Sequence, residues 1–304
     1  MSDIKLFEIN GDTVKNIEGR SVAVEKSLQS LMEKHLEDFL GIRFLGTEYT
    51  TGKTHGGRID TLGVDENDCP VIIEYKRSLN ENVINQGLYY LDWLLDHKAE
   101  FTLLMQKKFG AKTTENIDWP GARLLCIAGE FTKYDEHAVK QINRNIELLR
   151  YRKYGENLLL LELVNASTGD AESISNGGQA SKPRYSESTV TDKLEKSSLE
   201  LKDRFESLKA FLLALGDDVQ LKTLKLYFAF KRIKNFASVE VHPQTNKIVV
   251  FVKSDFEKVH LEDGFTRDVR TIGHYGTGDL EITLSTDEDL ERAKSLIIQS
   301  YEAN

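Results

Sequence analysis

The sequence contains little cysteine. Its two cysteines, Cys69 and Cys126, lie far apart and neither belongs to a Cys-x-x-Cys pair. Zinc ribbons and iron–sulfur clusters need several closely spaced thiolates, so this scarcity argues against both. A chain without paired cysteines fits a reducing compartment, and we expect the protein to be cytoplasmic.

Long apolar segments and an excess of basic residues are also missing. The run LLLLELV at 158–164 is far too short to cross a bilayer, and the start MSDIKLFEING has neither a basic leader nor an apolar stretch. We therefore expect neither membrane association nor export. The formal net charge of -9 argues mildly against nucleic-acid binding through overall charge. Contact with phosphates would need a local basic surface, or metal ions that offset carboxylates.

A segment of small and polar residues divides the chain. Residues 166–192 are rich in Ser, Gly, Ala and Thr and hold almost no large apolar residue, which is typical of a flexible linker. Residues 1–165 show a mixed pattern of helices and strands, and residues 193–304 show the pattern of a separate α+β domain. Two domains of these sizes are ordinary for a chain of 304 residues.

Hydrophobic periodicity and turn residues place the elements of each part. In the first part they predict a hairpin at 4–17, a helix at 21–40, a hairpin at 57–77, a helix at about 80–97, strands near 100–106 and 122–128, a helix at 135–151 and a strand at 157–164. In the second part they predict a helix at 194–216, strands at 225–231, 236–242, 247–253, 268–274 and 279–284, and a closing helix at 285–302.

The hairpin GRIDTLGVDENDCPVIIEYKR places charges within a strand that is otherwise fit for burial. Alternation puts Ile72, Glu74 and Lys76 on one face of the second strand. A turn centred on Asn67 places Asp60 directly opposite Glu74, with the two carboxylates side by side. Two like charges on directly opposite strand residues destabilise a sheet unless an opposite charge compensates them. Lys76 can supply part of the compensation and a divalent cation the rest, because Mg²⁺ prefers oxygen ligands.

Two helices bring further polar side chains toward apolar faces. Glu25 falls in helical register with apolar residues of the 21–40 helix, namely Leu28, Met32, Leu36 and Phe39. A glutamate in that position either caps the buried face or points into a site. On the helix after the hairpin, Gln86, Tyr90 and Trp93 share one face.

The order of these residues resembles the PD-(D/E)xK nuclease superfamily, and within it the RecB-like branch that includes the NucS mismatch endonucleases. The hairpin segment is similar to that superfamily's Asp–hairpin–Glu-x-Lys signature, with Ile59 in place of the proline of its name, and NQGLYYLDWL is similar to the Gln-x-x-x-Tyr helix of the branch. The resemblance covers about residues 1–165 and is strongest from 57 to 95. It implies an α/β fold with a restriction-endonuclease-like mixed sheet flanked by helices. The second part resembles the small α+β domain of unassigned function that is often appended to such modules.

The resemblance also implies a metal site. Asp60, Glu74 and the backbone carbonyl of Tyr75 would hold one or two Mg²⁺ or Mn²⁺ ions, and Glu25 would be an outer ligand. Lys76 would orient a water molecule or stabilise charge that develops on the phosphate.

The resemblance also implies supporting roles for residues in and around the matched motifs. Gln86 would position water or a backbone phosphate, and Tyr90 would brace Gln86 or line the groove. Arg58 and Arg77 flank the acidic pair and could meet phosphates, and His55 would lie in a loop near the site and could contact DNA.

The resemblance implies a Mg²⁺-dependent DNA endonuclease that acts in repair or in defence against foreign DNA, in the cytoplasm that the cysteine content leads us to expect. The second domain would bind nucleic acid, a partner protein or a second copy of the chain. Cutting both strands of a duplex would suggest a homodimer.

Structural interpretations of the same residues stay open. Asp60 or Glu74 could form an ordinary cross-strand ion pair with Lys76, Glu25 could face outward, and Tyr90 could be a core residue with a satisfied hydroxyl. Surface arginines need no phosphate to explain them, and the basic run at 225–234 is more typical of a half-buried strand with solvated lysines. The rival function is a non-catalytic DNA-binding or protein-interaction module on a nuclease-like scaffold.

Overall fold

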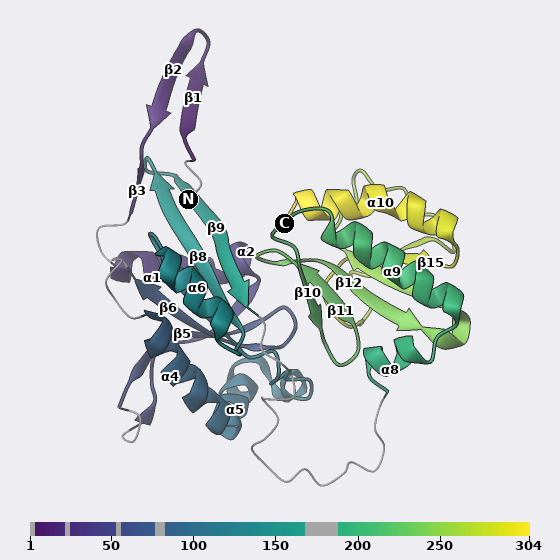
Figure 1. Ribbon diagram of the computed structural model, residues 1–304, viewed down its shortest axis with the longest axis horizontal. Coiled ribbons are helices and arrows are strands. Elements are labelled where there is room, and N and C mark those ends of the chain that lie inside the picture. Colours follow the sequence, from purple (N-terminus) through teal and green to yellow (C-terminus); the bar gives the residue numbers. More distant parts are fainter. Residues whose placement is uncertain (1–3, 22–24, 53–55, 77–82, 168–187) are drawn as a thin grey trace. The chain divides into compact units, whose positions relative to one another are not determined.

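The chain folds into two compact units, Met1–Gly178 and Gln179–Asn304 (Figure 1). The structure is a computed structural model that describes residues 4–21, 25–52, 56–76, 83–167 and 188–304. The ends of the expected linker at 166–192 belong to regular elements, because strand β9 continues to Ser167 and helix α8 begins at Val190. Residues 168–187 of that linker lie outside the described residues.

Unit 1 is built on a seven-stranded mixed sheet. The strand order is β3-β8-β7-β6-β5-β4, with β9 paired to β8. Only the pairs β6–β7 and β7–β8 are parallel among the ladders of this sheet in the described residues. The strands are β3 (Gly19–Arg20), β4 (Ile42–Thr50), β5 (Arg58–Asp65), β6 (Pro70–Lys76), β7 (Arg123–Ala128), β8 (Ile146–Tyr154) and β9 (Leu158–Ser167).

Helices cover both faces of this sheet. They are α1 (Glu25–Lys34), α2 (Leu36–Leu40), α4 (Val83–Asp96), α5 (Lys98–Phe109), the 3₁₀ turn η1 (Ala111–Thr114) and α6 (Lys133–Gln141). Helix α4 packs on the side of β6 that carries Ile72. Helix α1 lies on the face of the sheet that carries Tyr75. The hydroxyl of Thr61 is hydrogen-bonded both to Glu33 of α1 and to the Tyr75 hydroxyl. Residues an odd number of positions apart in a strand face opposite sides, so α1 and α4 lie on opposite faces.

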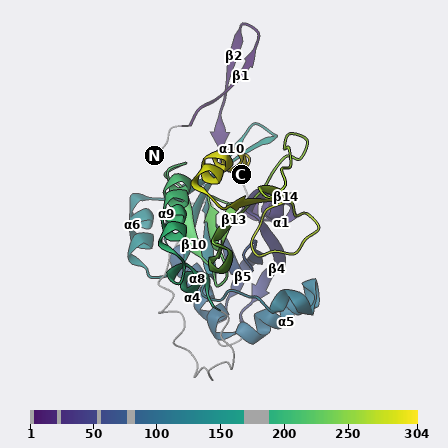
Figure 2. The same cartoon turned by 90° about the vertical axis from the view of Figure 1, so that its right-hand side faces the viewer.

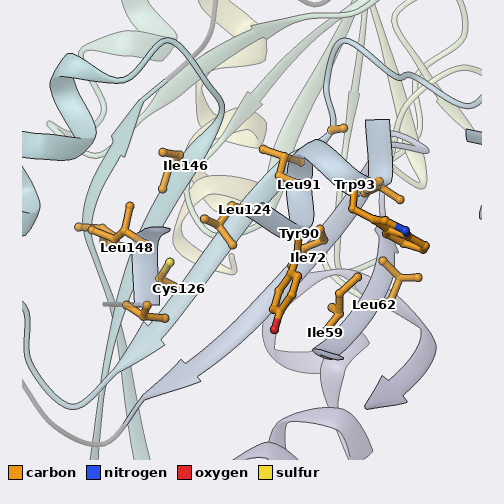
Figure 3. Close-up of a cluster of buried hydrophobic side chains, with 14 of the residues drawn as sticks. Ile59, Leu62, Ile72, Tyr90, Leu91, Trp93, Leu124, Cys126, Ile146 and Leu148 are labelled. Carbon is orange, nitrogen blue, oxygen red and sulfur yellow. The ribbon is translucent and has the colours of Figure 1, made fainter. Parts of the chain in front are cut away.

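The main core of unit 1 lies between α4 and the sheet. Leu91 and Trp93 of α4 belong to one buried cluster with Ile72 of β6 and Leu124 of β7 (Figure 3). Strand β6 is central and covered on both sides, which explains its almost continuous apolar sequence. Glu74 is the exception, a carboxylate in the middle of this buried layer.

A separate two-stranded sheet precedes the main sheet. Strands β1 (Leu6–Asn10) and β2 (Thr13–Ile17) pair only with each other among the described residues. Gly11 has φ +58° in the tight turn, a conformation that glycine adopts without strain. The predicted hairpin at 4–17 is therefore confirmed.

Two elements predicted for unit 1 were wrong, and the described part of the single helix expected at 21–40 forms two helices, α1 and α2. Residues 100–106 belong to helix α5, whose buried residues Phe101 and Met105 are four apart, as in a helix. Helix α6 ends at Gln141, and the rest of the predicted 135–151 helix enters strand β8. Strand β4 was not predicted at all.

Unit 2 has its own sheet and its own core. Its six antiparallel strands are ordered β10-β11-β12-β13-β15-β14. They are β10 (Gln220–Thr223), β11 (Phe228–Lys231), β12 (Asn235–His242), β13 (Lys247–Val252), β14 (Thr266–Asp268) and β15 (Leu280–Leu284). The helical elements are α8 (Val190–Glu195), α9 (Leu199–Leu213), the 3₁₀ turn η2 (Pro243–Thr245) and α10 (Asp287–Glu302). Helices α9 and α10 lie side by side on one face of this sheet (Figure 2).

The predictions for unit 2 were right in outline and wrong in places. The single helix expected at 194–216 is two helices, α8 and α9, and the strand expected at 268–274 ends at Asp268. Strand β10 was missed. Lys231 in the basic run is buried, so the expectation of solvated lysines fails there.

The fold class expected from the sequence is confirmed: a mixed sheet flanked by helices, with a second, smaller α+β unit. None of the described helices is long and apolar enough to cross a membrane.

Candidate active site

The hairpin of β5 and β6 has the register that the sequence predicts. Thr61 pairs with Ile73 and Val64 with Pro70, so the hairpin is centred on Asn67. One further step along the ladder places Asp60 opposite Glu74. The carboxylate of Asp65 fixes the turn by accepting from the amides of Asn67 and Cys69.

Side-chain hydrogen bonds replace the ladder at this point. The amide of Asp60 donates to Glu74 Oε1 at 3.2 Å, and the amide of Tyr75 donates to Asp60 Oδ2 at 3.0 Å. Beyond the Thr61–Ile73 pair, β5 stays paired with β4 and β6 stays paired with β7. The two carboxylates therefore fill the gap between separating strands, and each is held by a backbone amide of the opposite strand.

Glu74 is fully buried, and nothing in the described part of the chain offsets the cost of removing its second carboxylate oxygen, Oε2, from water. Oε2 finds no hydrogen-bond partner among the described residues. Cys126 is its buried neighbour on β7. Burial, and then the charge of Asp60, raise the pKa of Glu74 to about 8. A proton or a cation at this oxygen would remove the cost of leaving it unpaired.

Asp60 is the more accessible member of the pair. Burial raises its pKa, while the Tyr75 amide and the charge of Lys76 act in the opposite direction. The N–H and C=O of one strand residue point toward the same neighbouring strand, so the carbonyl of Tyr75 is directed into the gap that Asp60 fills. The donor set here consists of oxygens, as hard divalent cations prefer.

Lys76 and Glu25 meet beside the pair. Lys76 ends β6, and its Nζ lies 3.7 Å from Oε1 of Glu25, the first residue of α1. Both charges act on Glu74, because Lys76 lowers the pKa of that carboxyl and Glu25 raises it. The structure therefore groups Asp60, Glu74, Lys76 and Glu25 around one end of β6.

The sequence analysis missed Gln29, which holds α1 to this end of the sheet. Its buried amide donates to the backbone carbonyl of Asp60 at 2.8 Å and to Glu33 Oε1 at 3.0 Å. Glu33 in turn accepts from Thr61 at 2.6 Å. Gln29 and Glu33 lie one and two turns after Glu25, so the spacing on α1 was the available signal.

Glu48 of β4 was also missed. It forms ion pairs with Lys26 of α1 and with Arg58 of β5. The hydrogen bond from Lys26 is the largest influence on the pKa of Glu48, which is lowered. The sequence offered no signal for this residue because its strand was not predicted.

Gln86 and Tyr90 lie together on α4, next to the start of β5. The hydroxyl of Tyr90 accepts from Gln86 Nε2 and from the amide of Arg58, both at 3.2 Å. Tyr90 is only 6% exposed and lies near Ile59 and Ile72 in the core (Figure 3). From this buried position its hydroxyl holds both Gln86 and the backbone of Arg58.

Two of the expected site residues, His55 and Arg77, lie outside the described residues. Within the part of the chain that the structure covers, no three His, Cys, Asp or Glu side chains are grouped so as to hold a metal ion by themselves. Mg²⁺ sites often use only one or two carboxylates, with waters and substrate phosphate oxygens completing the shell. The Asp60–Glu74 pair, with its unpaired buried oxygen, fits that kind of site.

Comparisons with known proteins give relatives without a stated activity. Residues 190–304 match the model of a domain family described as a domain of unknown function, DUF5655. A Haemophilus influenzae protein named "Uncharacterized protein" is 27% identical over 304 residues, which is 98% of this chain and 99% of the relative.

One solved structure is also similar, the "Structure of EndoMS-dsDNA2 complex". It matches 48% of this chain and 64% of its own chain, with 15% identity and a TM-score of 0.26.

Proposed function

We propose that unit 1 is a Mg²⁺- or Mn²⁺-dependent nuclease that hydrolyses phosphodiester bonds in DNA. One observation carries this proposal. Asp60 and Glu74 are held side by side between separating strands, and Glu74 Oε2 is buried without a hydrogen bond in the described part of the chain. A protein that only binds nucleic acid gains nothing from a carboxylate pair that repels phosphate.

Asp60, Glu74 and the carbonyl of Tyr75 would hold the ion, and Glu25, whose charge acts on Glu74, would be an outer ligand. When bound, Mg²⁺ or Mn²⁺ polarises a phosphate and lowers the pKa of a water molecule. The protein supplies carboxylates that two backbone amides already orient, so little reorganisation accompanies loading.

Lys76 supplies a positioned cation. Its ammonium group lies 3.7 Å from Glu25 and its side chain is largely buried, so it has a limited range of positions. In that place it can orient the attacking water or stabilise charge on the phosphate. Gln86, braced by Tyr90, would position a water or a backbone phosphate.

The rival proposal is a non-catalytic DNA-binding or protein-interaction module. The net charge of -9 favours the protein-interaction form of this rival, because it disfavours contact with the phosphates of DNA. The two proposals differ in one respect that can be measured, which is turnover of a phosphodiester.

A cleavage panel tests the proposal. Single-stranded, duplex, nicked, mismatched and branched DNA, with an RNA control, are incubated with Mg²⁺, Mn²⁺ or EDTA. We expect metal-dependent cleavage of at least one substrate by the wild type, and a loss of roughly 100-fold or more for Lys76→Ala. Lys140→Ala, at an exposed site on α6, is the matched control and should keep full activity. Equal cleavage by both variants would identify a contaminant, and no cleavage of any substrate would favour the rival.

A further inference from the structure

A charged cluster lies next to the carboxylate pair, formed by Lys26, Glu48 and Arg58, one residue each from α1, β4 and β5. Glu48 Oε1 accepts from Lys26 Nζ at 2.6 Å, and its other oxygen pairs with Arg58 Nε. One carboxylate therefore holds two cations from two different elements. The three residues are called the Lys26–Glu48–Arg58 cluster below.

Each of the three residues of the cluster lies close to Asp60. Thr47 pairs with Thr61 and Tyr49 with Ile59, so Glu48 falls opposite Asp60 across the β4–β5 ladder. Arg58 lies two residues before Asp60 on β5. Lys26 lies one turn before Gln29, whose amide holds the Asp60 carbonyl.

The two cations face solvent while the carboxylate lies beneath them. The side chains of Lys26 and Arg58 are 58% and 64% exposed, and that of Glu48 is 27% exposed. Arginine has five N–H donors and the ion pair uses its Nε, so the outer edge of the guanidinium stays available to a ligand. A phosphodiester is the ligand that such paired cations recognise.

The backbone at Glu48 supports a role beyond stability. Glu48 has φ +49°, a left-handed conformation that residues other than glycine, asparagine and aspartate seldom adopt. Such strain persists where the surroundings over-determine it, often at a binding site. Here it interrupts the regular pleat of β4 at the position that faces Asp60, where an ordinary strand would set two carboxylates side by side.

We propose that the Lys26–Glu48–Arg58 cluster binds a backbone phosphate of nucleic acid, with Glu48 as the positioning residue that holds both cations in place. This inference rests on the proposed function and gives it a local basic surface within an acidic chain. The bound phosphate would lie beside Asp60, so the cluster would place the strand for cleavage.

The positioning role of Glu48 predicts an unusual effect when its negative charge is removed. Removal of a carboxylate near a phosphate site strengthens nucleic-acid binding if only overall charge matters. If Glu48 positions the two cations, its removal weakens binding instead. Glu48→Gln, which keeps the size of the side chain, therefore separates the two accounts.

The experiment measures binding of a labelled DNA duplex and a single strand of equal length across a salt series, in EDTA and in Ca²⁺. We expect Lys26→Ala and Arg58→Ala each to lower the slope of log affinity against log salt by about 1, and to weaken binding several-fold. Glu48→Gln should also weaken binding. Two matched controls at exposed sites, Lys34→Ala and Glu37→Gln, should leave the slope unchanged.

A stability measurement excludes a merely structural role. Glu48→Gly relieves the positive φ but loses two partly exposed ion pairs, so its thermal transition should stay close to that of the wild type while its DNA affinity falls. A fall in both would overturn the positioning role. Wild-type slopes in all the cluster variants, or no DNA binding by the wild type in either condition, would overturn the phosphate site.

The outcomes for the two proposals remain distinguishable. A wild type that binds DNA with the expected slopes but cleaves nothing in Mg²⁺ or Mn²⁺ would contradict the nuclease and support the cluster. A wild type that cleaves DNA, with all cluster variants binding and cleaving as well as it does, would contradict the cluster alone.

Discussion

Glu74 stands in the middle of an apolar strand with both faces covered, and the described residues offer its Oε2 no hydrogen bond. A buried, unpaired carboxylate oxygen lowers the stability of a fold, and apolar residues would fill the same strand without that cost. Such a residue is expected where function requires it, which is the reason for proposing that it holds a metal ion.

The stability of the metal-free protein should decrease with pH because of Glu74. Its pKa is raised from 4.5 to about 8 by burial and by Asp60, so the native state holds a proton that the unfolded state releases between those values. The unfolding free energy then falls as pH rises through this window, by at most about 1.4 kcal/mol per pH unit.

Denaturant unfolding in EDTA at a series of pH values, for wild type and Glu74→Gln, measures this contribution. The variant carries no titrating group at position 74, so its advantage over the wild type should grow from pH 5 to pH 8. A constant difference between the two proteins across this range would show that Glu74 titrates normally. Glu37→Gln, at an exposed acid, should follow the wild type.

At the scale of elements, the site depends on how closely α4 approaches the start of β5. Tyr90 of α4 holds the Arg58 amide and Gln86 with one hydroxyl. Its ring lies so near the chain that a Cβ added to Gly57 would be 2.4 Å from Tyr90 Cε1. Glycine is therefore required here for close packing.

Gly57→Ala should destabilise unit 1 by about 1–3 kcal/mol, because the methyl group displaces the Tyr90 ring and its hydrogen bonds. Chemical denaturation measures the loss. Gly46→Ala, in β4 of the same unit, is the control, since a Cβ there meets only Tyr49 Cδ2 at an ordinary contact distance of 3.6 Å. If the two variants unfold alike, the contact of Gly57 with Tyr90 does not constrain α4.

The hairpin of the site could be predicted from the sequence, and its surroundings could not. Alternation in β6 and the turn at Asn67 define the register locally, so the opposition of Asp60 and Glu74 followed directly. Glu48 depends on a positive φ and on the docking of α1, which are tertiary features without a local signal. Gln29 lies on a helix that was predicted, but its partner is a backbone carbonyl far along the chain.

The wrong prediction of a strand at 100–106 has a clear physical origin. Phe and Thr, the residue types at positions 101 and 102, are enriched in strands, and composition favoured that interpretation of 100–106. In the structure Leu103 is exposed, and only Phe101 and Met105 of helix α5 are buried, because one side of that helix meets the core. The helical spacing of the buried residues, rather than the amino-acid composition, indicates the correct element there.

At the scale of the whole molecule, each unit holds its own core. The buried cluster of unit 1 is drawn from residues 45–148, and that of unit 2 from residues 190–297. No residue belongs to both clusters in the described chain. Separate cores are the condition for independent folding.

The fragments 1–167 and 188–304 should therefore each fold alone, with one cooperative transition and a stability of about 5–15 kcal/mol. Circular dichroism during thermal unfolding of the separate fragments tests this. A fragment that is unfolded alone and folded only in the full chain would show that the cores depend on each other.

The central claim is that a divalent cation binds between Asp60 and Glu74, and calorimetric titration with Mn²⁺ tests it most directly. The wild type should bind one or two ions with a dissociation constant on the order of hundreds of micromolar or tighter. Asp60→Asn, which keeps the shape of the side chain, should lose this binding, and Asp38→Asn, at an exposed site on α2, should keep it. Equal Mn²⁺ binding by the wild type and Asp60→Asn would contradict the account.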